Sequence, residues 1–352
     1  MSLFSFAAIG INHDHIQGQV KAMLGAGCTF KSFYCPDDAM AQAFTEKFPM
    51  AERVMDQRRI LEDPTIKLVL SSAIPGDRAQ IGLEVMRHGK DFMSDKPGLI
   101  SLEELDEVRR VQAQTKQIYS ILYSEHYDQR ATIKACDLVK AGAIGEVIHT
   151  AGLGPHRIRK NQRPDWFFKR ARYGGILTDI GSHQAEHFCY LTGAQDAQIL
   201  SATVANRAHP DKPELQDFGD MLFATERATG YVRVDWFTPD GLSTWGDGRM
   251  FITGTEGTIE LRKYIDVAGR EGKDHLFLVD RKGMHYFDCT EVEKPFGKQL
   301  AFDVLNRTQT HMSQAHCFKA MELALKAQAM AEAKAKSQGG AARPGLVWRL
   351  LA

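Results

Sequence analysis

The first 123 residues alternate short apolar runs with helical segments, and this alternation limits the chain to few folds. Five runs have the length and composition of buried strands: residues 4–9, 28–35, 66–73, 91–94 and 117–123. Each of the first four is followed by a segment with helical periodicity. Strands that alternate with helices predict a parallel sheet covered on both faces. The sequence therefore predicts an α/β fold that opens with a parallel sheet, whose ligand lies at the carboxyl ends of the strands.

The pattern changes after residue 123. A helix is expected at 129–141, a strand from Glu146, a loop at 154–175 and a helix at 179–191. Between residues 198 and 290, strand-like runs separated by turn residues predict consecutive antiparallel strands, and helix returns at 299–335. We therefore expect a second, α+β domain built on consecutive antiparallel strands. The predicted units are a first domain at 1–123, a second domain at 124–336 whose last helix packs back on the first, and a tail at 337–352.

The charge balance and the cysteine pattern exclude several classes of protein. Lys plus Arg and Asp plus Glu both number 44, which gives no indication of a nucleic-acid or acidic-membrane partner. The six cysteines lack CxxC spacing, so no zinc ribbon or disulfide framework is expected and no metal is assigned. We see neither a signal peptide nor an apolar run of about 18 residues, and we expect a cytoplasmic protein.

The turn after the first strand is the candidate nucleotide site. Aligned on G-x-G-x-x-G, it retains Gly10, with Asn12 and His15 in the other two glycine positions. Asn12 tolerates a left-handed backbone and its amide is a candidate phosphate ligand, while the amides of the following helix would bind a pyrophosphate. A strand–turn–helix without a nucleotide explains the turn alone equally well.

The end of the second strand bears on the choice of dinucleotide. An acid there normally holds the adenine ribose, but Cys35 occupies the position, with Asp37 and Asp38 just beyond it. Either aspartate is a candidate for the ribose hydroxyls or for capping the next helix. No arginine stands there in the sequence for a 2′-phosphate, so NAD is favoured and NADP is the alternative.

Lys96 is the candidate reactive group of the first domain. It follows the fourth strand at its carboxyl end, where a nicotinamide would lie, and the cationic ring would lower its pKa. Pro97 would stiffen the turn. On residue types alone, a surface lysine beside Asp95 is the simpler interpretation.

Four segments in order carry a family resemblance: Gly10 in its turn, DKPG at 95–98, AGAIGEV at 141–147 and GGILTDIGSHQAEH at 174–187. Over roughly residues 1–330 the chain resembles the Gfo/Idh/MocA oxidoreductases, which include glucose–fructose oxidoreductase and inositol dehydrogenase. The resemblance implies a doubly wound Rossmann domain followed by an α+β domain with a mixed, mostly antiparallel sheet. It implies hydride transfer between a sugar or polyol carbon and NAD(P). It also implies a homodimer or homotetramer formed through the C-terminal sheet.

The resemblance also implies site residues. Lys96 and His183 would act as acid and base, and Asp179, one helical turn before His183, would bind a hydroxyl or orient the site. The residues assigned to the cofactor are Gly10, Asn12, His15, Asp37, Ser72, Pro75, Arg78, Asp95, Lys96, Pro97 and Glu125. The residues assigned to the substrate are His126, His156, Arg157, Trp166, Asp179 and His183.

The loop at 154–175 carries the remaining candidates. Trp166 suits stacking on a sugar face, and Arg157 and Arg163 are candidates to hold a carboxylate, sulfonate or phosphate. Core packing and salt bridges to the sheet explain the same residues. The chain departs from the family in its glycine turn, at Arg78, where a histidine is common, and at His126, near a common arginine.

Three other functions remain open. A glycosidase that oxidises a sugar transiently with NAD would use the same Lys96 and His183. A non-catalytic sugar or NAD sensor would share the fold. His183-Gln184-Ala185-Glu186-His187 also fits H-x-x-E-H, the pattern of a metallohydrolase.

Overall fold

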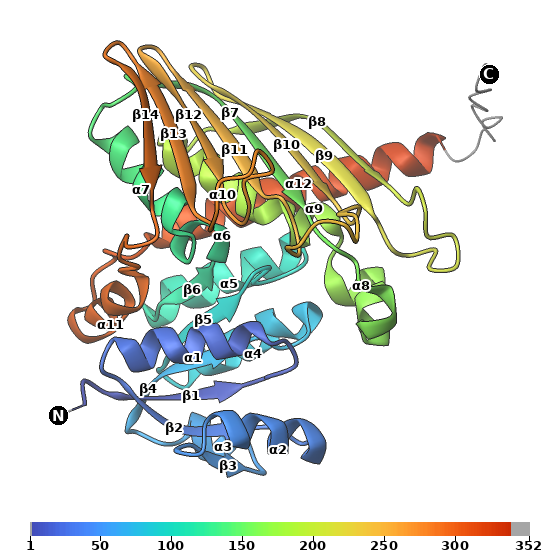
Figure 1. Ribbon diagram of the computed structural model, residues 1–352. Coiled ribbons are helices and arrows are strands. Elements are labelled where there is room, and N and C mark those ends of the chain that lie inside the picture. The colour runs from blue at the N-terminus through green and yellow to red at the C-terminus, as the bar shows by residue number, and fades with distance from the viewer. Residues whose placement is uncertain (1, 339–352) are drawn as a thin grey trace.

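The computed structural model describes residues 2–338 and forms two units stacked on each other (Figure 1). The first unit is a six-stranded parallel sheet in the order β3-β2-β1-β4-β5-β6, the Rossmann order. Its strands and helices are β1 (Ser5–Ile9), α1 (His15–Gly25), β2 (Thr29–Tyr34), α2 (Asp38–Lys47), β3 (Glu52–Val54), α3 (Arg58–Leu61), β4 (Ile66–Ser71), α4 (Pro75–Arg87), β5 (Asp91–Asp95), α5 (Leu102–Thr115) and β6 (Tyr119–Leu122).

This unit confirms the predicted strand–helix alternation. The central strands are almost wholly buried, as expected for a parallel sheet covered on both faces. The sequence pattern missed β3 and α3, which have only three and four residues and therefore show no periodicity.

The second unit is an eight-stranded sheet in the order β14-β13-β12-β11-β7-β10-β9-β8. Neighbouring strands are antiparallel except β7 and β10, which run parallel. This confirms the mixed, mostly antiparallel sheet. Its strands are β7 (Val147–Pro155), β8 (Gln198–Ala205), β9 (Phe218–Ala224), β10 (Thr229–Asp235), β11 (Arg249–Gly254), β12 (Gly257–Arg262), β13 (His275–Asp280) and β14 (Gly283–Asp288).

The helices of this unit are more broken than expected. They are α6 (Ser124–Tyr127), α7 (Arg130–Lys140), α8 (Arg170–Tyr173), α9 (Ile176–Asp179), α10 (Gly181–Thr192), α11 (Phe296–Asn306) and α12 (Gln314–Gln338), with short 3-10 turns at Lys160–Gln162 and Asp165–Phe168. The single helix expected at 299–335 is two helices. The chain turns at Arg307, whose backbone is left-handed, and the Asp303 carboxylate accepts hydrogen bonds from Thr310 and His311 in the connection.

Helix α12 lies between the two units (Figure 1). It contacts α5 and β6 of the first unit, and α9, α10 and β8 of the second. The sequence prediction for 337–352 falls almost entirely outside the described residues. Within residues 2–338, no helix is long and apolar enough to cross a membrane.

Candidate active site

A cavity of about 600 Å³ lies where the two units meet. Its walls come from the turn after β1, from the carboxyl end of β5 and from the second unit between Ser124 and Tyr264. The cavity therefore sits at the strand ends where an open parallel sheet binds its ligand. Eleven of the predicted site residues line it: His15, Pro75, Arg78, Asp95, Lys96, Glu125, His156, Arg157, Trp166, Asp179 and His183.

The start of α1 forms one side of this cavity. Gly10 has φ 79°, and a Cβ there would lie 2.4 Å from the Cβ of Ala73, so only glycine lets the turn pack on the end of β4. Gly18, in the second turn of α1, lines the cavity and has no atom within 4 Å of the position a Cβ would take. A helix start with a bare side facing an open cavity fits the pyrophosphate of a dinucleotide.

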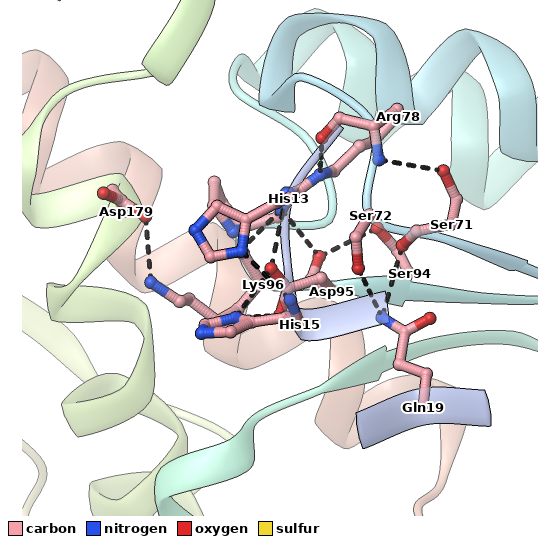
Figure 2. Close-up of polar contacts among 12 residues, drawn as sticks. His13, His15, Gln19, Ser71, Ser72, Arg78, Ser94, Asp95, Lys96 and Asp179 are labelled. Atoms are coloured by element: carbon pink, nitrogen blue, oxygen red, sulfur yellow. Dashed lines mark hydrogen bonds and ion pairs between the residues drawn. The ribbon is translucent and has the colours of Figure 1, made fainter. Parts of the chain in front are cut away.

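Arg78 supports the turn at Lys96 (Figure 2). Its guanidinium is buried and donates to the carbonyl oxygens of Ala73, Asp95, Lys96 and Pro97, and to the Asp95 carboxylate at 3.3 Å. All three guanidinium nitrogens are thus engaged by the protein. Arg78 therefore fixes the backbone that carries Lys96, while its contact with a cofactor stays a prediction.

Asp95 is also bound from the other side. The Nδ1 atom of His15 lies 3.1 Å from the Asp95 carboxylate (Figure 2). Although burial would raise the pKa of Asp95, His15 and Arg78 hold it well below its usual range. Asp95 is therefore a buried carboxylate that ties α1 to the Lys96 turn.

Lys96 reaches across the cavity to the second unit. Its Nζ lies 3.0 Å from Oδ1 of Asp179, and both side chains are mostly buried (Figure 2). Lys96 precedes a cis peptide bond to Pro97. Asp179 ends α9, so residues 83 positions apart meet in one ion pair.

Two neutral histidines line the cavity together with Lys96 and Asp179. Burial lowers the pKa of His183 to about 3, and the Nδ1 atom of His183 is buried without a hydrogen-bond partner. Burial lowers the pKa of His156 to about 4. Because Nδ1 of His156 donates to the Gly154 carbonyl, its Nε2 is left as an acceptor.

Beneath His183 lies a buried charge pair that the sequence did not indicate. The Lys263 ammonium, wholly buried, donates to Oε2 of Glu125 at 2.7 Å, and the Gln184 amide donates to the same oxygen at 2.8 Å. Burial opposes ionisation of Glu125, but Lys263 and the nearby histidines hold its pKa well below the usual value. The second oxygen, Oε1, is buried without a partner. Glu125 thus lies in the cavity wall as a carboxylate paired from behind.

His126 does not face the cavity. Its Nδ1 lies 2.8 Å from Oε1 of Glu186, which is also bound by His316 at 2.8 Å. Burial alone would lower the pKa of His126, but the Glu186 carboxylate raises it to about 10. This corrects its assignment to the substrate: the three residues join α6, α10 and α12 in the interior.

The remaining predicted residues lie outside the cavity lining. Asp37 accepts a hydrogen bond from the Met40 amide at 2.8 Å and so caps α2, the alternative that the sequence left open. The carbonyl of Ser72 accepts from the His13 amide, and its hydroxyl accepts from Gln19. Gly10, Asn12 and Pro97 are likewise not lining residues.

The end of β2 does have an arginine. Arg53 from β3 donates to the Cys35 carbonyl and pairs with Asp38 at 2.7 Å. Its distance along the chain hid it from the sequence argument. This removes the ground for favouring NAD over NADP.

An aromatic wall closes the substrate side. Trp166, Trp236, Trp245 and Tyr264 line the cavity, and His156 packs edge-on against Trp236 and Trp245. Of these, the sequence singled out only Trp166 and His156. Arg157 lines the cavity, but its guanidinium donates to the carbonyls of Pro239 and Leu242 and so holds that loop in place.

The structure argues against a metal hydrolase. In the described part of the chain, the one group of three ligands close enough to share an ion is His13, His15 and Asp95, and the H-x-x-E-H histidines are not in it. Glu186 is bound by His126 and His316 instead. The Asp95 carboxylate already carries Arg78 and His15, which disfavours a cation there.

Comparison with known proteins agrees with the fold. Residues 132–260 match the model of the GFO/IDH/MocA C-terminal domain. A crystal structure from Erwinia carotovora atroseptica SCRI1043, described as an oxidoreductase, is 42% identical, with a TM-score of 0.90 over 93% of this chain and 98% of that one. The structure of levoglucosan dehydrogenase with NADH and levoglucosan shares the fold at 18% identity, with a TM-score of 0.77 over 95% and 97% of the two chains.

The curated relatives are more distant. Scyllo-inositol 2-dehydrogenase (NAD(+)) of Bacillus subtilis (strain 168) is 24% identical over 76% of this chain and 70% of its own length. Matched stretches span from 39% to 70% of the curated relatives' lengths.

Fold and cavity together define a two-domain oxidoreductase of the Rossmann type. More narrowly, the chain belongs to the Gfo/Idh/MocA family.

Proposed function

We propose that this protein moves a hydride between a hydroxyl-bearing carbon of a sugar or polyol and a nicotinamide dinucleotide. The observation that carries the proposal is the meeting of Lys96, Asp179 and His183 on one cavity beside the start of α1. The 18%-identical levoglucosan dehydrogenase was solved with NADH and a sugar, and the inositol dehydrogenase relative is named for NAD(+). These names support the same chemical class for this chain.

The residues present fit the dinucleotide. The bound nicotinamide supplies the hydride acceptor, or the donor in the reverse reaction. The amides of α1 and the bare side at Gly18 hold its pyrophosphate, and the Arg78-supported turn sets the position of Lys96. The proposed mechanism uses no contact of Arg78, Asp37 or His126 with the cofactor or the substrate.

Lys96 and His183 have different roles at the substrate oxygen. His183 is neutral at ordinary pH, so a ring nitrogen accepts the hydrogen bond and then the proton of the reacting hydroxyl. Lys96, held by Asp179, donates to the same oxygen and stabilises the negative charge that develops there. The Glu125 carboxylate behind His183 stabilises the imidazolium that forms. In the reverse direction the proton returns to the oxygen.

The test is an assay of purified full-length protein with NAD⁺ and NADP⁺ and a panel of sugars and polyols. Reduced nicotinamide should form with at least one member and be lost in Lys96→Ala and in His183→Ala, with the fold checked by circular dichroism. Retention of normal turnover in both variants would refute the mechanism. Cleavage of a glycoside without net reduced nicotinamide would identify the glycosidase instead.

A further inference from the structure

The charges on the substrate side of the cavity do not balance. We call this part of the lining the substrate wall; its charged members are Glu125, Asp128, Arg157, Arg159, Arg163 and Asp179. Each of its three acids already has a lysine partner: Glu125 has Lys263, Asp128 has Lys294 and Asp179 has Lys96. The three arginines are therefore not neutralised by the acids of the wall.

The three arginines differ in how far the protein engages them. Arg157 is bound by loop carbonyls and lies 3.6 Å from the fully exposed Asp240. Within residues 2–338, neither Arg159 nor Arg163 has a carboxylate within ion-pair distance. Arg159 is exposed, whereas Arg163 is half-buried, and a half-buried cation without an anion is the unusual feature.

Arg163 is held with its terminal nitrogens free. Its Nε donates to the Ile158 carbonyl at 2.9 Å, and its guanidinium lies 4.5 Å from the ring centre of Phe167 and 5.2 Å from that of Trp236. In the described part of the chain, Nη1 and Nη2 donate to no protein acceptor and are not among the buried unpartnered atoms, so they are accessible to solvent on a residue that lines the cavity. A planar fork fixed on aromatic rings is preorganised to grip an oxyanion with two hydrogen bonds.

The electrostatics agree with this geometry. Burial lowers the pKa of Arg163, the Asp179 carboxylate opposes the shift, and the neighbouring Arg159 adds to it. The guanidinium remains charged at ordinary pH. It therefore stands near the Lys96–Asp179 pair, next to a second cation and with no anion of its own.

We propose that the substrate is an anionic carbohydrate whose carboxylate or phosphate is bound by Arg163, with Arg159 assisting, while its reacting hydroxyl lies at Lys96 and His183. This proposal rests on the proposed function and deepens it by naming the substrate class. Trp166 and Trp236 line the same cavity as Arg163, Lys96 and His183. The ring lies against the aromatic wall and the anion fixes which hydroxyl reaches Lys96.

The experiment compares matched compounds on the full-length protein: a neutral hexose, its uronate, its aldonate and its 6-phosphate. Each is tested for dinucleotide reduction, and separately for binding to the NAD-loaded protein by calorimetry. We expect at least one anionic member to bind at least about tenfold more tightly than the hexose. Comparison of the uronate and aldonate with the 6-phosphate shows whether Arg163 binds a carboxylate or a phosphate.

Arg163→Gln and Arg163→Lys are the test variants. Arg207→Gln is the matched control, because Arg207 also lies over an aromatic ring, Phe218, and is not part of the cavity. Arg163→Gln should weaken binding of the anionic compound by about 30-fold, Arg163→Lys by about tenfold because it keeps charge but loses the fork, and Arg207→Gln should have no effect. The neutral hexose should respond to none of them.

The outcomes separate this inference from the proposed function. Turnover of neutral sugars with no preference for the anions, unchanged in Arg163→Gln, would overturn the inference and leave the oxidoreductase standing. Arg163-dependent binding of an anion without any dinucleotide reduction would support the inference and refute the proposed function.

Discussion

Lys96 and Asp179 form an ion pair that crosses from one unit of the protein to the other, with 3.0 Å between Nζ and Oδ1. The lysine stands on the turn after β5, and the aspartate ends α9. The pair lies on the cavity wall, so a substrate oxygen that enters meets an ammonium whose orientation is already set.

Replacing Asp179 with Asn should therefore leave the fold and dinucleotide binding intact but lower kcat by about 10²-fold, since Lys96 loses the anion that orients it. Steady-state kinetics and dinucleotide fluorescence titration give the two readouts. Lys326→Ala, which breaks a surface ion pair with Glu322, is the control. A variant with normal kcat would show that the pair is only structural.

The pH profile should reflect the lowered pKa of His183. Because burial brings that pKa to about 3, the ring stays neutral as pH falls. The value of kcat/KM should therefore show no decrease with an ordinary histidine pKa between about pH 8 and about pH 5. Initial rates across this range test the point. An acid limb of kcat/KM with a pKa near 6.5 would contradict it.

Glu125 and Lys263 should behave as a coupled pair. Glu125→Gln leaves the wholly buried Lys263 ammonium unpaired and should reduce the free energy of unfolding by about 3 kcal/mol. The double variant with Lys263→Met should regain most of that stability, yet stay slower than wild type because His183 lacks a carboxylate behind it. Urea unfolding and kcat measured on the same preparations separate the two effects.

Stability should fall at alkaline pH through His126. Its pKa rises from the ordinary 6.5 to about 10 beside Glu186, so its contribution is complete below about pH 6.5 and is lost as pH rises through about 10. Urea unfolding at about pH 7 and about pH 9.5 should show a larger loss in wild type than in His126→Gln. Equal losses in the two proteins would exclude the pair as the source.

We expect the outer face of the second sheet to form an interface with a second copy of this chain. Tyr231 and Phe251 are exposed and both pair with Ala151 on the strand between them, forming an apolar row on the face opposite α10. Such a patch is typical of an interface. The double change Tyr231→Lys and Phe251→Glu should shift a dimer or tetramer toward monomer in analytical ultracentrifugation; a wild-type monomer would rule the interface out.

Local pattern was enough for most of the fold. Parallel strands as apolar as β4 and hairpins as clear as β13–β14 are set by contiguous residues, and both were predictable. Partners far apart in sequence were not: Lys263 reaches Glu125 from 138 positions away, and Arg53 reaches the end of β2 from another strand.

Residue type also gave little indication of which way a side chain points. Arg78 and His126 look like ligand-binding groups in the sequence, but both are buried and turned to protein acceptors. Lys96, Asp179 and His183 were grouped by the family resemblance, because spacing alone leaves the second unit unpositioned, and all three line one cavity.

Helix α12 packs on both units, and this limits how the enzyme can exchange its ligands. A continuous rod fastened to α5 and β6 below and to α10 and β8 above resists hinge bending between the halves. Ligand exchange would then depend on local changes in the loops that line the cavity, and not on rotation of one unit against the other.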